Sequence, residues 1–127
     1  MAPIRILLVD DQLLFRKGLR ALLEDEDGFE VVGEASDGAK AVEHVRSARP
    51  DVVLMDIHMP VCGGAEATRL IKSEWPEIKV VALTISDEDE DLFEAIKSGA
   101  DGYLVKPFKP GELRDCVRRI ARKPAED

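Results

Sequence analysis

The sequence predicts an α/β fold, a doubly wound parallel sheet of five strands with helices on both faces. Short aliphatic and β-branched runs alternate five times with longer stretches in which apolar residues recur at helical spacing. The short runs are apolar almost throughout, as expected of parallel strands that helices cover on both faces. Because such crossovers are right-handed, few arrangements of five strand-helix units remain.

The first half of the chain contains three strands and two helices. Arg49-Pro50 ends the second helix, because a residue before proline disfavours helical backbone. The predicted segments are a strand at 4–9, a helix with Phe15, Leu19, Leu22 and Leu23 on one stripe, a strand at 30–35, a helix carrying Ala41, Val42 and Val45, and a strand at 51–55.

The second half continues the alternation. Trp75-Pro76 ends the third helix, and Ser98-Gly99 caps the fourth. The predicted segments are a helix at 65–73, a strand at 78–83, a helix at 87–97 with Leu92, Phe93 and Ile96 inward, a strand at 102–105, and a helix from 110 with Leu113, Val117 and Ile120 inward. Five units without a closed ring favour the flavodoxin-like order 2-1-3-4-5.

Length and composition indicate one domain, at 1–122, with 123–127 as a tail or the start of a linker. No segment approaches the roughly 18 apolar residues of a membrane span, and no signal peptide is recognisable, so we expect a cytoplasmic chain without a membrane partner. Cys62 and Cys116 match no zinc or redox motif and are expected to be reduced thiols. The net charge of -8 disfavours direct nucleic-acid binding.

Polar residues follow four of the predicted strands where each strand ends. In an open α/β sheet, binding sites form at the carboxyl ends of the strands, so these side chains should meet at one edge. They are Asp10 and Asp11 after the first strand, Asp56 after the third, Thr84 after the fourth and Lys106 after the fifth.

This set of residues predicts a site that handles phosphate. Close carboxylates repel one another unless a cation joins them, and oxygen ligands favour Mg²⁺. Lys106 and Thr84 could neutralise and orient phosphoryl oxygens, and Asp56 is the natural nucleophile. A single Asp at a strand end is more often a turn residue or, as Asp11 could be, a helix cap. The joint occurrence of four such strand ends favours the functional interpretation.

The chain resembles the receiver domains of bacterial two-component response regulators over essentially its whole length. The matching segments are Leu7-Leu8-Val9-Asp10-Asp11, Asp51-Val52-Val53-Leu54-Met55-Asp56-Ile57-His58-Met59-Pro60, Ala82-Leu83-Thr84 and Gly99-Ala100-Asp101-Gly102-Tyr103-Leu104-Val105-Lys106-Pro107-Phe108. The stretch from Asp11 to Arg20 is similar to the NarL/FixJ-type subgroup, whose members usually continue into a helix-turn-helix domain that binds DNA.

The resemblance implies a role for each strand-end residue. Asp56 would accept a phosphoryl group from a phosphohistidine on a sensor histidine kinase or phosphotransfer protein, while Thr84 and Lys106 contact that group. The Mg²⁺ ligands would be the carboxylates of Asp10, Asp11 and Asp56 and the backbone carbonyl of His58. The family's cis peptide would precede Pro107. Such a domain supports its own phosphotransfer and autodephosphorylation and is not an enzyme acting on other substrates.

Several positions leave questions open. Gly63 stands where the family commonly has Asp, which leaves the start of the third helix uncertain, and the bulk of Ile85 could narrow access to the phosphoryl group. Tyr103 stands where receivers carry an aromatic switch residue, the alternative being an aromatic that covers the sheet edge. The imidazole of His58 is a second candidate for tuning phosphoryl lifetime.

The last helix carries a basic face that is either its solvated side or a partner surface. Pairing with the acidic run at 87–91 of a second copy would give a homodimer. The basic residues are Arg114, Arg118, Arg119, Arg122 and Lys123.

Two other functions remain to be distinguished. A Mg²⁺-dependent phosphohydrolase of the haloacid-dehalogenase type also uses an Asp nucleophile at a strand end, but needs a second Asp where His58 stands. A pseudo-receiver would be a scaffold with a vestigial acidic site, against which the full set of strand-end residues argues.

Overall fold

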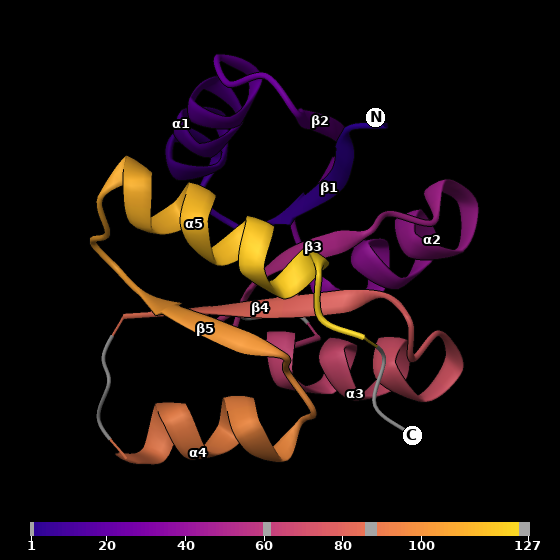
Figure 1. Ribbon diagram of the computed structural model, residues 1–127. Coiled ribbons are helices and arrows are strands. Elements are labelled where there is room, and N and C mark those ends of the chain that lie inside the picture. Colours follow the sequence, from indigo (N-terminus) through magenta and orange to yellow (C-terminus); the bar gives the residue numbers. More distant parts are fainter. Residues whose placement is uncertain (1, 60–61, 86–88, 125–127) are drawn as a thin grey trace.

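In the computed structural model, the described residues are 2–59, 62–85 and 89–124, without the side chains of 89, 91 and 92. Strands and helices alternate throughout these ranges (Figure 1). The elements are β1 (Ile4–Val9), α1 (Leu13–Glu24), β2 (Phe29–Ala35), α2 (Gly38–Ala48), β3 (Val52–Asp56), α3 (Gly64–Glu74), β4 (Lys79–Thr84), α4 (Asp89–Lys97), β5 (Gly102–Val105) and α5 (Pro110–Ala121).

The strands form one parallel sheet in the order β2-β1-β3-β4-β5, which confirms the predicted fold class and order. The predicted bounds of the strands differ by at most one residue from the observed ones. The third helix begins at Gly64, the second glycine of the Gly63-Gly64 pair, one residue earlier than predicted. Residues 87 and 88, predicted to begin the fourth helix, lie outside the described residues.

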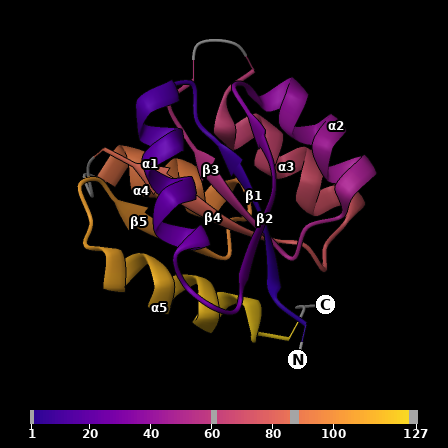
Figure 2. The same cartoon turned by 90° about the horizontal axis from the view of Figure 1, so that it is seen from above.

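Helices cover both faces of the sheet (Figures 1 and 2). One face packs against α1 and α5, through Leu19, Leu23, Leu113, Val117 and Ile120. The other face packs against α2 and α3, through Ala41, Val45, Ala67 and Ile71. Residues 6–9 of β1 and all residues of β3 and β4 are buried between these layers, which explains why these segments are largely apolar. No helix in the described part of the chain is long and apolar enough to cross a membrane.

The inward face predicted for α4 is wrong. Phe93 and Ile96 are 62% and 66% exposed, and the helix packs instead through Ala95, which is 1% exposed and contacts Ile57 and Ala82. The side chain of Leu92 lies outside the described part. A small residue lets α4 approach the sheet, and the larger apolar side chains beside it stay in solvent. Helical spacing alone does not distinguish these two faces.

Candidate functional site

The carboxyl ends of β1 and β3 bring three carboxylates together. Val9 pairs with Met55, so Asp10 and Asp56 leave the sheet side by side. One carboxylate oxygen from each of Asp10, Asp11 and Asp56 lies within 4.8 Å of the others. The predicted cluster of three acidic residues therefore exists at this edge.

Asp10 is fully buried and held on several sides. Its Oδ1 accepts a hydrogen bond of 2.9 Å from the Gln12 amide, and its backbone carbonyl accepts one of 2.6 Å from Arg16 Nη1. Arg16 Nε in turn donates to Glu34 at 2.7 Å. Asp11 is exposed, and the N-cap of α1 is Gln12, so Asp11 is not the helix cap that was its alternative interpretation.

Asp56 ends β3 and is 4% exposed. Its Oδ1 accepts a hydrogen bond of 3.0 Å from the backbone amide of His58. Burial raises the pKa of Asp56 to about 6, against the attraction of Lys106, and the charge of Asp10 adds to the rise. A nearby cation would strongly stabilise the ionised form of Asp56, which burial and the charge of Asp10 disfavour.

Lys106 supplies the positive charge of the site. Its Nζ lies 2.9 Å from Asp10 Oδ2 and 3.9 Å from Asp56 Oδ2, and it stands 4.1 Å from the centre of the Phe15 ring. The peptide bond between Lys106 and Pro107 is cis, as the resemblance implied. Ring and carboxylates together hold the ammonium at the rim of the acidic cluster.

Thr84 ends β4 next to β3 and is 1% exposed. Its Oγ1 has no hydrogen-bond partner in the described part of the chain, although buried hydroxyls are normally paired. Ile85 is 64% exposed, and its effect on access stays a prediction. Tyr103 is 43% exposed, which fits the outward position of the proposed switch residue and equally its alternative as a cover of the sheet edge.

The residues of this site fit Mg²⁺. The three carboxylates offer hard oxygen ligands, and one ammonium does not balance their charge. The predicted ligand role of the His58 carbonyl stays a prediction, while its amide bond to Asp56 fixes the residue beside the acidic cluster. Asp10, Asp11 and Asp56 would hold the ion.

Two supporting features could not be predicted from motifs. Arg16 joins Asp10 to Glu34, a contact that depends on the pairing of β2 with β1. Burial would raise the pKa of Glu34, but hydrogen bonds from Lys17, Arg16 and Arg20 lower it to about 2. At Gly64 a Cβ would overlap the Asp56 carbonyl oxygen, so α3 can start against β3 only with glycine there.

The basic face of α5 has a partner within the chain. Arg118 Nη2 lies 3.0 Å and Arg114 Nε 3.6 Å from the carboxylate of Glu26, just beyond α1. Most of the acidic run at 87–91, the predicted counterpart, has no described side chains. Ion pairs within the chain therefore account for Arg114 and Arg118 of this basic face.

The sheet order and the strand-end residues together define a receiver-type α/β domain. A family model described as the response regulator receiver domain matches residues 6–118, and the chain belongs to this family. The haloacid-dehalogenase alternative is thereby removed as a family assignment.

Known relatives agree with this assignment. The chain is 44% identical over 117 residues to the response regulator UvrY of Escherichia coli, covering 92% of the chain and 54% of UvrY. It is 42% identical over 119 residues to the transcriptional regulatory protein DegU of Brevibacillus brevis, covering 94% of the chain and 50% of DegU. The chain thus spans about half the length of these relatives.

A solved structure has the same fold. The signal receiver domain of NarL from Mycobacterium tuberculosis superposes with a TM-score of 0.92 at 32% identity, covering 98% of this chain and 100% of that one. Similarity to the NarL/FixJ-type subgroup therefore extends from sequence to structure.

Proposed function

We propose that this chain is a phosphorylation-dependent switch in which Asp56 accepts a phosphoryl group from a phosphohistidine on a histidine kinase or phosphotransfer protein. The observation that carries this proposal is the position of Lys106 Nζ, 2.9 Å from Asp10 and 3.9 Å from Asp56, within a cluster of three carboxylates. Carboxylates and one ammonium are the groups that phosphoryl transfer requires.

In the transfer, a carboxylate oxygen of Asp56 attacks phosphorus as the phosphorus–nitrogen bond of the donor breaks. An acyl phosphate forms, and the imidazole leaves with the electron pair and takes up a proton. Asp10, Asp11 and Asp56 would hold Mg²⁺, whose charge would offset that of the phosphoryl oxygens. Lys106 stabilises the same oxygens, and the unpaired hydroxyl of Thr84 can donate to one of them.

The new charge would bias the surface around Thr84, α4 and Tyr103 between two states. The relatives include a response regulator and a transcriptional regulatory protein that are each about twice as long as this chain. We infer that the switch regulates transcription through an output domain outside this sequence, which would supply the contact with DNA.

Intact-mass measurement with acetyl phosphate tests the acceptor. With Mg²⁺ the chain should gain one phosphoryl group that hydroxylamine removes, as expected of an acyl phosphate, and chelation of Mg²⁺ should prevent the gain. Asp56→Asn should abolish it, whereas the control Asp115→Asn, on the exposed side of α5, should retain it. No gain under conditions where Mg²⁺ binds would contradict the proposal and support a pseudo-receiver scaffold.

A further inference from the structure

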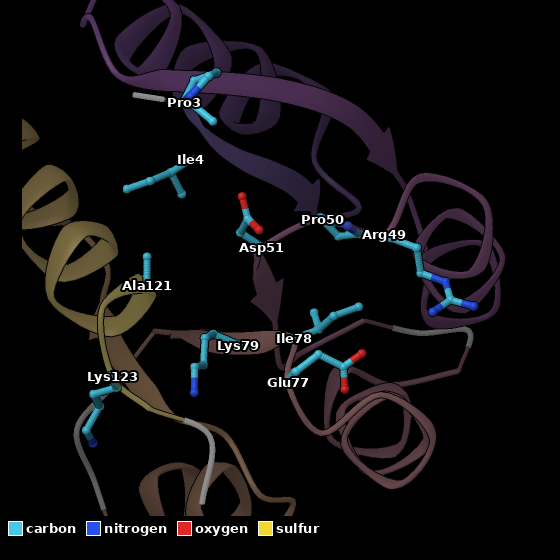
Figure 3. A pocket seen from close by; sticks show the side chains of 11 residues that line it. Pro3, Ile4, Arg49, Pro50, Asp51, Glu77, Ile78, Lys79, Ala121 and Lys123 are labelled. Carbon is cyan, nitrogen blue, oxygen red and sulfur yellow. The ribbon is translucent and has the colours of Figure 1, made fainter.

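A cavity of about 480 Å³ lies at the end of the sheet opposite the acidic cluster (Figure 3). β1 begins at this cavity with Ile4 and leads to Asp10 at its other end, a distance of roughly 20 Å for six residues. The cavity opens between the starts of β1, β3 and β4 and the end of α5. It is therefore separate from the proposed phosphoryl site.

Lys79 is the unusual residue of this cavity. As the first residue of β4 it is only 6% exposed, and its amide donates to the Asp51 carbonyl at 3.0 Å. Its ammonium group has neither a hydrogen bond nor an ion pair with any residue in the described ranges. The side chain of Lys79, most of which is buried, therefore presents its ammonium to the cavity, where the group is available to pair with an anion.

The other charges of the cavity do not satisfy Lys79. Arg49 stands 5.2 Å from the centre of the Trp75 ring and donates to the Arg46 carbonyl at 3.1 Å. Asp51 Oδ2 accepts a hydrogen bond of 2.9 Å from the Arg5 amide. In Figure 3 the Asp51 carboxylate points away from the Lys79 ammonium.

A second cation and an apolar wall complete the cavity. The exposed Lys123 lines it, and Figure 3 shows its ammonium on the same side as that of Lys79, with the Glu77 carboxylate across from both. Ile4, Ile78 and Ala121 line it as well. Two ammonium groups that have no partner among the described residues, beside aliphatic side chains, suit an anion that carries an apolar body.

We propose that this cavity is a binding site for a small organic anion, whose carboxylate or phosphate group pairs with Lys79 and Lys123. Its apolar part lies against Ile4, Ile78 and Ala121. The inference does not depend on the proposed phosphotransfer, because none of its residues belongs to the acidic cluster at the other end of the sheet.

Amide NMR titrations of the full chain with acetate, hexanoate and inorganic phosphate, in the presence of a chelator, test this site. Saturable shifts are expected at Ile4, Asp51, Lys79 and Lys123. Hexanoate should bind at least about threefold more tightly than acetate because it buries additional methylenes. Tighter binding of phosphate than of acetate would indicate a ligand with a phosphate group. Tighter binding of acetate would indicate a ligand with a carboxylate group.

Variants of the cavity lysines distinguish binding at this site from general effects of ionic strength on the spectrum. Lys79→Met should weaken hexanoate binding at least about tenfold, as expected for loss of one charge-assisted hydrogen bond. Lys123→Met, at an exposed position after the end of α5, should weaken it about threefold to tenfold. Lys40→Met, on an exposed part of α2, is the control and should change nothing. Shifts that do not saturate, or that the Lys79 and Lys123 variants leave unchanged, would overturn the proposal.

Discussion

Lys106 Nζ and Asp10 Oδ2 form a 2.9 Å ion pair between residues 96 positions apart in the sequence. The pair joins the end of β5 to the end of β1. Because Asp10 is also a proposed Mg²⁺ ligand, the ammonium and the metal ion repel each other while both attract the same carboxylate.

Replacing Lys106 with methionine should therefore have opposite effects on two steps. Loss of the ammonium should tighten Mg²⁺ binding by about tenfold, since one positive charge leaves the cluster. The yield of acetyl-phosphate labelling should fall, because the phosphoryl oxygens lose a partner. Calorimetric titration and intact-mass measurement report the two steps, with Lys40→Met as a control. Weaker Mg²⁺ binding in the methionine variant would contradict a competition between Lys106 and Mg²⁺ for the Asp10 carboxylate.

The raised pKa of Asp56 predicts a specific dependence of stability on pH. Since the folded pKa of about 6 exceeds the ordinary 3.8, the folded chain binds more protons than the unfolded chain between these values. The free energy of unfolding should then fall as pH rises from 4 to 6, by at most about 3 kcal/mol. Urea unfolding with a chelator should show this fall, and Asp56→Asn should remove it. An unchanged slope in that variant would show that other groups cause the dependence.

Much of this organisation could be predicted from the sequence, because four of the five strand ends are marked by a motif residue. Asp10, Asp56, Thr84 and Lys106 follow continuous apolar runs, and parallel pairing brings such ends to one edge. The inward face of α4 could not be predicted, since its packing through Ala95 depends on how closely the helix approaches Ile57 and Ala82.

Other features depend on three-dimensional contacts that spacing does not encode. Arg16 reaches the Asp10 carbonyl and Glu34 only because β1 and β2 pair as they do. Lys79 has no partner among the described residues because Arg49 and Asp51 direct their own side chains elsewhere. The sequence shows that a lysine begins β4, but it does not predict whether the ammonium of this lysine has a partner.

Thr84 and Thr68 provide a matched pair, because both have a buried hydroxyl without a partner in the described residues. Valine has nearly the same shape, so either substitution should raise the free energy of unfolding by about 1–2 kcal/mol. Only Thr84→Val should abolish the spectral response of α4 to beryllofluoride. Loss of the response in Thr68→Val as well would indicate a general packing effect.

Gly64 and Gly63 are a second pair. A Cβ at Gly64 would overlap the Asp56 carbonyl oxygen and lie 2.8 Å from Ile57 Cα, whereas at Gly63 the nearest atom is 3.9 Å away. Gly64→Ala should lower the free energy of unfolding by at least about 2 kcal/mol. Gly63→Ala should change it by less than about 1 kcal/mol. Equal effects in urea unfolding would contradict the close approach of α3 to β3.

Amide spectra of the chain with Mg²⁺, before and after addition of beryllofluoride as a phosphoryl substitute, test the switch most directly. The shifts should extend from Asp56 to Thr84, to residues 93–97 of α4 and to Tyr103, and Asp56→Asn should prevent them. A spectrum that beryllofluoride leaves unchanged, although Mg²⁺ alone shifts Asp10 and Asp11, would contradict a phosphorylation-dependent switch.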